Sequence, residues 1–224
     1  MIHELRTYTF HPGKQPEYLK FAEEIGRPIR GNDYGLNQGY WTSEIGTLNQ
    51  IWHLWSYESL DAREALRQKL AKNDAWKNEY VAKIRGLIQK QETRFLSPVL
   101  DFKPPTTAGN IYEFRHYQCL TGHASEFLKR LKGVMPARAK YSEPVCLWQG
   151  EAPFPNNVAH LWAYKNMNAR AEIRAKVAAD PEWQAFLGKP SLLVHMENTI
   201  LFPTNYSPLK CSHAATSKTD RHRT

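Results

Sequence analysis

The chain has 224 residues, 42% of them hydrophobic and 23% charged, with a formal net charge of +8. These proportions are ordinary for a soluble globular protein, and no apolar run approaches the roughly 18 residues that a membrane-spanning helix needs. The positive charge forms no basic run within residues 1–203, which argues against a nucleic-acid partner.

The sequence repeats itself once over a whole domain length. Residues 2–8 (IHELRTY) return as residues 111–117 (IYEFRHY), and residues 51–57 (IWHLWSY) return as residues 158–164 (VAHLWAY). A solenoid would repeat every 20–50 residues or so, whereas these offsets exceed 100 residues and indicate a duplicated domain. Positions kept in both copies must therefore be constrained by something that applies to both.

The elements follow the same order in each copy. Period-two alternation predicts a first strand over 2–10, and an apolar stripe with Tyr18 and Ile25 predicts a helix that is disturbed at 26–28. Strands near 39–45 and 50–57 follow, then a helix with Asp61 as its N-cap and a last strand over 88–96. The second copy repeats this order, with strands near 145–150, 157–164 and 193–202 and with Asn168 as the second N-cap.

This order, β-α-β-β-α-β twice, predicts an α+β fold of two tandem ferredoxin-like domains. We expect the first domain over 1–98, a Pro-rich linker over 99–110, the second domain over 111–203 and a disordered basic tail over 204–224. The three cysteines, Cys119, Cys146 and Cys211, are not kept between the copies and are interpreted as reduced thiols. With a strand starting at residue 2, no targeting segment is recognised, and we expect a cytoplasmic protein.

Two rows of side chains are kept in both copies. Alternation puts Glu4, Arg6 and Tyr8 on one face of the first strand and His53, Trp55 and Tyr57 on one face of the third. Because helices need an apolar floor, we expect Leu5 and Leu54, with Phe114 and Leu161 in the second copy, to face them. The rows then cover the open faces of the two sheets, which would meet as a closed eight-stranded barrel with an aromatic, charged lumen.

A small-molecule site in that lumen is the first interpretation. Arg6 and Arg115 would bind an anion, oriented by glutamates, while the tryptophans form flat walls and the histidines and tyrosines fix orientation. The candidate ligand-binding residues are Glu4, Arg6, Tyr8, His53, Trp55, Tyr57, Glu92, Glu113, Arg115, Tyr117, His160, Trp162, Tyr164 and Glu197. Arg30 and Arg138 are also kept, and anion binding and a surface role explain them equally well.

A structural ion-pair network explains the same rows, since buried charges need partners whether or not a ligand exists. Trp41 and Trp148, and likewise Trp76 and Trp183, are interpreted as core residues. The sequence contains no phosphate loop, metal-ligand pattern or nucleophile elbow, so no cofactor or metal is expected. The histidine and the central carboxylate kept in each copy could serve as acid or base, but no nucleophile is nominated. A homo-oligomer is possible, because homodimers are the commonest assemblies, but no interface is nominated.

Residues 4–8 followed by Pro12-Gly13, and residues 53–57 followed by Asp61-Ala62-Arg63 and Arg67, resemble the signatures of NIPSNAP-domain proteins. The second copy matches through 113–117, 160–164, Arg170 and Arg174. The resemblance implies a dimeric α/β-barrel fold and no established catalytic set. The functions to weigh are a small-molecule binding protein, a cofactor-independent monooxygenase or isomerase by analogy with related barrels, and a packed protein-interaction module.

Overall fold

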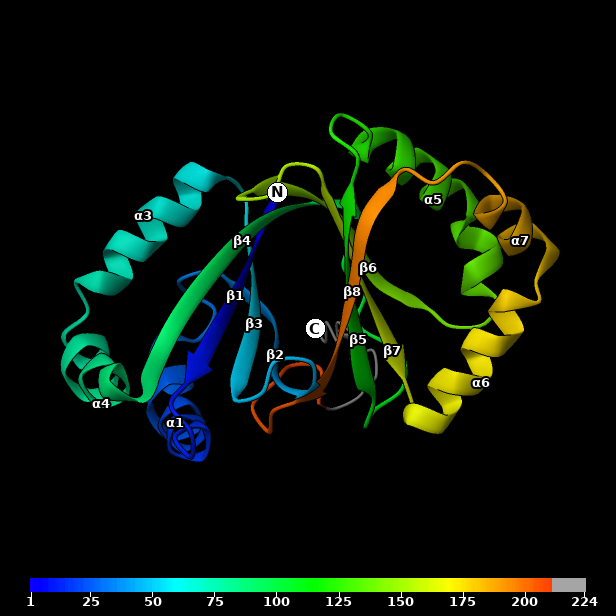
Figure 1. Cartoon of the computed structure of the whole chain (residues 1–224). Coiled ribbons are helices and arrows are strands. Elements are labelled where there is room, and N and C mark those ends of the chain that lie inside the picture. The colour runs from blue at the N-terminus through cyan, green and yellow to red at the C-terminus, as the bar shows by residue number, and fades with distance from the viewer. Residues whose placement is uncertain (211–224) are drawn as a thin grey trace, which may run out of the picture.

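Eight strands close into a barrel in the order β1-β3-β2-β8-β5-β7-β6-β4, with the helices outside (Figure 1). The computed structural model describes residues 1–210. The first repeat comprises β1 (Ile2–Phe10), α1 (Gln15–Phe21), η1 (Ala22–Gly26), α2 (Arg27–Arg30), β2 (Leu36–Ile45), β3 (Gln50–Tyr57), α3 (Leu60–Ala71), η2 (Trp76–Val81), α4 (Ala82–Ile84), η3 (Arg85–Leu87) and β4 (Ile88–Leu100). The second comprises β5 (Ile111–Cys119), α5 (Ala124–Ala139), β6 (Pro144–Ala152), β7 (Asn157–Tyr164), α6 (Met167–Ala178), α7 (Pro181–Leu187) and β8 (Leu193–Pro203).

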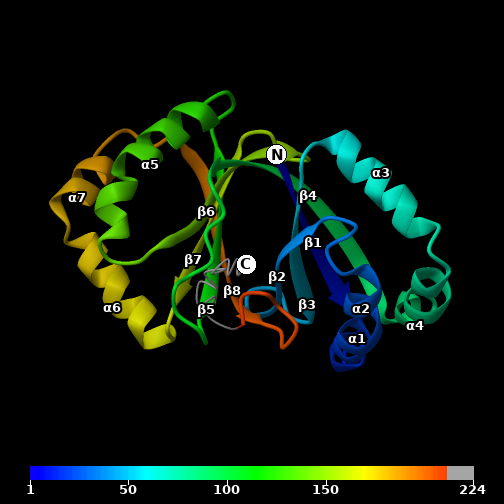
Figure 2. The same cartoon turned by 180° about the vertical axis from the view of Figure 1, so that it is seen from behind.

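The two repeats join along two antiparallel seams. Strand β2 pairs with β8 and strand β4 pairs with β6, while β1 and β3, or β5 and β7, lie at the centre of each half. The helices of each repeat cover the outer face of its own sheet, as both views show (Figure 2). The predicted fold class, two ferredoxin-like units closed sheet to sheet as a pseudo-dimeric barrel, is confirmed.

Local signals set the element ends with small departures from prediction. The N-caps are Ser59 and Asn166, two residues before the predicted ones, and they accept hydrogen bonds from the backbone N–H groups of Ala62 and Ala169. The backbone of both cap residues is extended, so the side-chain oxygen can accept a hydrogen bond from the N–H group three residues later. Asp61 and Asn168 lie inside the helix, where the helical backbone does not allow this contact. The predicted disturbance at 26–28 coincides with the end of the π-helical η1, whereas Pro136 lies within an unbroken α5.

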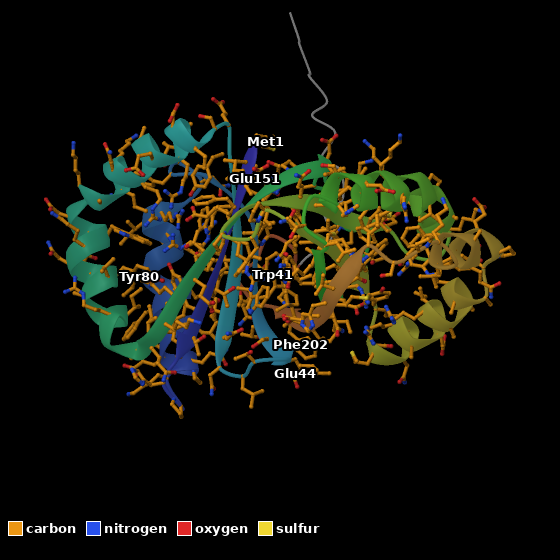
Figure 3. The ribbon with its side chains drawn as sticks, turned by 45° about the horizontal axis from the view of Figure 1, so that its top comes forward. Met1, Trp41, Glu44, Tyr80, Glu151 and Phe202 are labelled. Carbon is orange, nitrogen blue, oxygen red and sulfur yellow. The ribbon has the colours of Figure 1, made fainter. Side chains whose placement is uncertain are left out.

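The lumen of the barrel is a packed apolar core. Leu5 and Leu54 meet Phe114 and Leu161 there, at exposures of 3% or less, and Trp41 and Trp148 fill the space between them. Figure 3 shows Trp41 between the two halves and Tyr80 on the helix side of the first sheet. The expected orientation is therefore wrong: the leucines face the lumen, and both charged and aromatic rows face the helices.

Enclosure explains the reversal. An eight-stranded barrel has an interior just wide enough to be filled by side chains, and strands surround it on every side. Charged groups at the centre of the lumen, among the leucines and tryptophans, would lose hydration without space for compensating partners. The helix-facing side of each sheet can hold charged groups, because the helices contribute arginines that pair with the charged row and leave open space beside it. The expected orientation assumed that the helices must pack on the purely apolar face of each sheet, and this assumption does not hold here.

The segment after β8 closes one side of this core, so the expectation of disorder from residue 204 is wrong for residues 204–210. Leu209 is 2% exposed and belongs to the lumen cluster, and its carbonyl accepts a hydrogen bond from the Tyr112 hydroxyl at 3.1 Å. Ser207 accepts one from the Tyr40 backbone. Strand β4 also runs to Leu100, two residues into the expected linker. Residues 211–224, with Cys211, lie outside the described residues, while Cys119 and Cys146 are buried free thiols.

We expect Leu209→Ala to lower the free energy of unfolding by about 2 kcal/mol or more, because it opens a cavity in the lumen. Urea denaturation followed by tryptophan fluorescence measures this. Lys210→Ala, at the exposed neighbouring position, should stay within about 0.5 kcal/mol of the parent protein. Equal midpoints for the two variants would contradict a packing role for this segment.

Candidate functional site

Each repeat holds one pocket between its sheet and its helices, on the side opposite the lumen. The pocket of the first repeat has a volume of about 490 Å³ and that of the second about 380 Å³. Both volumes fall in the range typical of small-molecule sites. The residues that line the two pockets at corresponding positions are Arg6 and Arg115, Tyr8 and Tyr117, Arg30 and Arg138, His53 and His160, Arg67 and Arg174, and Trp76 and Trp183.

A buried glutamate anchors the charged row of each sheet. The Glu4 carboxylate is fully buried and accepts hydrogen bonds from Arg6 at 2.7 Å and from Arg63 of α3 at 2.9 Å. Burial alone would raise the pKa of Glu4, but Arg63 and Arg6 outweigh it and lower the pKa to about 2. Glu113 repeats this with Arg115 at 2.7 Å and Arg170 at 2.6 Å, and its pKa is likewise lowered to about 2.

A second arginine is held by an aromatic pair from β3. Arg30 donates to the Tyr57 hydroxyl at 3.0 Å, and its guanidinium lies 3.3 Å from the centre of the Trp55 ring. Arg138 donates to Tyr164 at 2.9 Å, with its guanidinium 4.1 Å from the Trp162 ring. Arg138 also donates to the Ser142 hydroxyl at 2.6 Å. Stacking and these hydrogen bonds fix each guanidinium while leaving other N–H groups available. The Nε of Arg30 is buried without a hydrogen-bond partner among the described residues.

The histidines of both pockets are neutral donors. The Trp55 indole N–H donates to Nδ1 of His53 at 2.6 Å, and Trp162 donates to Nδ1 of His160 in the same way. Burial lowers the pKa of His53 well below 6.5, with Arg6 adding to the effect, and lowers that of His160 to about 3, with Arg115 adding. Because Nδ1 accepts, the proton lies on Nε2, which has no partner among the described residues in either ring.

The pockets carry an excess of positive charge. Arg6, Arg30, Arg63 and Arg67 gather near a single carboxylate, Glu4. Among residues 1–210, Arg67 has no acidic partner within salt-bridge distance, and burial together with Arg6 lowers its pKa. In the second repeat Arg174 lies 3.9 Å from Glu113, which Arg115 and Arg170 already occupy. Such clusters favour an added anion.

Most of the predicted site residues are brought together, but not where the sequence analysis expected them. Arg6, Tyr8 and His53 line the first pocket, and Arg115, Tyr117, His160 and Trp162 line the second. Glu4, Glu113, Trp55, Tyr57 and Tyr164 support them from behind through the contacts given above. Trp41 and Trp148 are core residues as expected.

Glu92 and Glu197 do not belong to these pockets. They pair in register with Thr7 and His116, whose side chains face the lumen, and both line a polar pocket of about 410 Å³ between the repeats. Arg67, Arg174, Trp76 and Trp183 also line the pockets, although none was predicted from the sequence as a site residue and the two tryptophans were predicted as core. Their retention at a constant offset of 107 residues was the available signal.

Two features are absent from residues 1–210. No helix there is both long and apolar enough to cross a membrane. No group of three or more His, Cys, Asp or Glu side chains in that part of the chain is arranged to hold a metal ion.

Comparisons with known proteins agree with this architecture. The crystal structure of a monooxygenase-like protein from Lactobacillus acidophilus aligns with a TM-score of 0.67 and 14% identity, covering 94% of this chain and 97% of that one. At this identity the likeness shows the fold alone.

The NIPSNAP family model matches residues 3–102 and 112–208, once per repeat. The chain belongs to the NIPSNAP family. Human Protein NipSnap homolog 3A is 29% identical over 94% of this chain and 86% of its own length, and mouse Protein NipSnap homolog 3B is 30% identical over 93% and 86%. The predicted resemblance is confirmed; it does not assign an activity.

Proposed function

We propose that this protein binds small anionic molecules, one in each pocket between a sheet and its helices. One observation carries the proposal: three arginines and a neutral histidine donor converge in each pocket, against one buried carboxylate that two arginines already bind. Arginine suits a carboxylate or phosphate because its planar fork donates parallel hydrogen bonds and stays charged when partly buried.

The histidine geometry favours binding over proton-transfer catalysis. A general base needs an unprotonated nitrogen within reach of the substrate proton. In both rings the acceptor nitrogen, Nδ1, already receives the tryptophan N–H, and the low pKa keeps the ring neutral. Nε2–H is then a donor to a ligand oxygen. Trp76 and Trp183 provide a flat apolar wall in their respective pockets, which suits an aromatic or aliphatic body.

The test uses benzoate as a compact aromatic carboxylate. Isothermal titration at pH 7.5 should find two sites per chain, and Arg67→Met or Arg174→Met should each weaken one of them more than tenfold while leaving the other intact. Arg94→Met is the matched control, because it removes the same charge from a residue of the polar pocket between the repeats.

Arg67 is suitable because its loss strands no carboxylate, so the melting temperature should stay near that of the parent protein. Unchanged benzoate binding in Arg67→Met and Arg174→Met, or an equal loss in Arg94→Met, would contradict the proposal. Native mass spectrometry of the freshly purified protein would then identify any natural ligand that co-purifies.

A further inference from the structure

The two pockets share their arginines and histidine but differ in the rest of their lining. Gln91 lies opposite Tyr8 in the strand register, and the corresponding pair in the second repeat is Met196 and Tyr117. At the same offset as the repeat, Tyr18 of the first pocket corresponds to Phe127 of the second. Both exchanges replace a hydrogen-bonding group by an apolar one.

The first pocket is rich in polar groups. The Tyr80 hydroxyl donates to that of Tyr18 at 3.1 Å, and Arg85, Gln89 and Gln91 complete the rim. Gly26 makes the tyrosine pair possible, since a Cβ at this position would lie 2.6 Å from the Tyr80 ring. Hydroxyl and amide groups around an anion site suit a ligand that carries polar groups of its own.

The second pocket is apolar away from its cations. Leu187 takes the place of Tyr80 and is 60% exposed, and Met196 is 51% exposed, although both line the pocket. Large apolar side chains left open to water around a pocket are stabilised when a ligand covers them. The other apolar residues of this lining are Phe127, Leu131, Val177, Phe186, Leu192 and Leu193.

Building on the anion sites proposed above, we propose that the second pocket binds monocarboxylates with an extended apolar body, such as medium-chain fatty acids, and that the first pocket does not. The carboxylate lies against Arg138, Arg174 and the Nε2–H of His160. The alkyl chain covers Phe127, Leu187 and Met196. Both pockets therefore bind an anionic group with the same arginines and histidine, but each accepts a different class of ligand body.

Isothermal titration of the intact protein with butanoate, hexanoate, octanoate and decanoate tests this. We expect one site per chain for octanoate, with an affinity that rises up to about fourfold per added methylene. The double variant Phe127→Tyr/Met196→Gln, which copies the first repeat, should weaken octanoate binding about tenfold. The reverse variant, Tyr18→Phe/Gln91→Met, should leave the existing site at its original affinity.

The outcomes separate this inference from the proposed function. An affinity independent of chain length, two equal octanoate sites, or an unaltered Phe127→Tyr/Met196→Gln variant would overturn the inference, while benzoate binding lost in Arg174→Met would still support the anion sites. Failure of both benzoate and the whole alkanoate series to bind would overturn both. Melting temperatures of the variants serve as the control for misfolding. They should stay near that of the parent protein, because Met196 is half exposed and Phe127→Tyr adds a single hydroxyl.

Discussion

The protein is expected to lose most of its stability between pH 6.5 and pH 5. Four histidines are held neutral in the folded chain: burial, with further contributions from neighbouring positive charges, lowers the pKa of His3 and His116 to about 4 and that of His160 to about 3, and places that of His53 well below 6.5. In the unfolded chain these groups titrate near 6.5. Below that pH the unfolded state binds protons that the folded state does not.

The difference in proton binding between the unfolded and folded states sets the sign and size of the change in the free energy of unfolding with pH. Each histidine lowers the free energy of unfolding by about 1.4 kcal/mol per pH unit below 6.5 until its folded pKa is reached, or about 2 kcal/mol at pH 5. His3, His116 and His160 together account for about 6 kcal/mol, comparable with the whole stability of a typical domain, and His53 adds a loss of the same sign. The pKa values of Glu4 and Glu113, lowered to about 2, extend the loss from about pH 4.5 downward.

Urea unfolding between pH 7.5 and 5 measures the slope. His160→Asn keeps an acceptor for the Trp162 indole but removes one titrating group, so its stability should depend on pH by about one proton less. His123→Asn, at an exposed position, should follow the parent protein. A free energy of unfolding that is constant from pH 7.5 to 5 would show that these rings are not held neutral.

The sequence alone predicts the architecture but assigns the candidate site residues to the wrong face of each sheet. Alternation in 2–10 and 50–57, helical spacing and the internal repeat suffice for two β-α-β-β-α-β units, because these patterns are local. Which face of the sheet meets the other repeat is not local. Both faces of β1 and β3 are buried: Leu5 and Leu54 on one side, Arg6 and Trp55 on the other. Burial on both faces removes the contrast between an apolar and a polar side that would otherwise set the orientation.

Partners distant in sequence decided the rest. Glu4 and Arg6 are recognisable as an ion pair from their spacing. The arginines around them come from two helices, Arg63 and Arg67 from α3 and Arg30 from α2. Their retention in the second copy is visible in the sequence. The arginines form a candidate site only because the helices place their side chains over the same part of the sheet.

Glu4 and Glu92, both predicted from the sequence as ligand-binding residues, should differ strongly in their contribution to stability. Glu4→Gln should lower the free energy of unfolding by about 3–5 kcal/mol, because it leaves Arg6 and Arg63 in a buried place without their shared counter-charge. Glu92→Gln should change it by less than about 1 kcal/mol, since the Glu92 side chain is 40% exposed and, among residues 1–210, pairs only with Lys90 at 3.1 Å.

Arg6→Met adds a third point to this comparison. Arg63 donates two hydrogen bonds to Glu4, so the carboxylate keeps a partner when Arg6 is lost, and the cost should be smaller than that of Glu4→Gln. Urea denaturation at pH 7.5 gives all three values. Similar losses for Glu4→Gln and Glu92→Gln would mean that the buried glutamate does not organise the arginines, and the pockets would then lack the fixed donors on which anion binding rests.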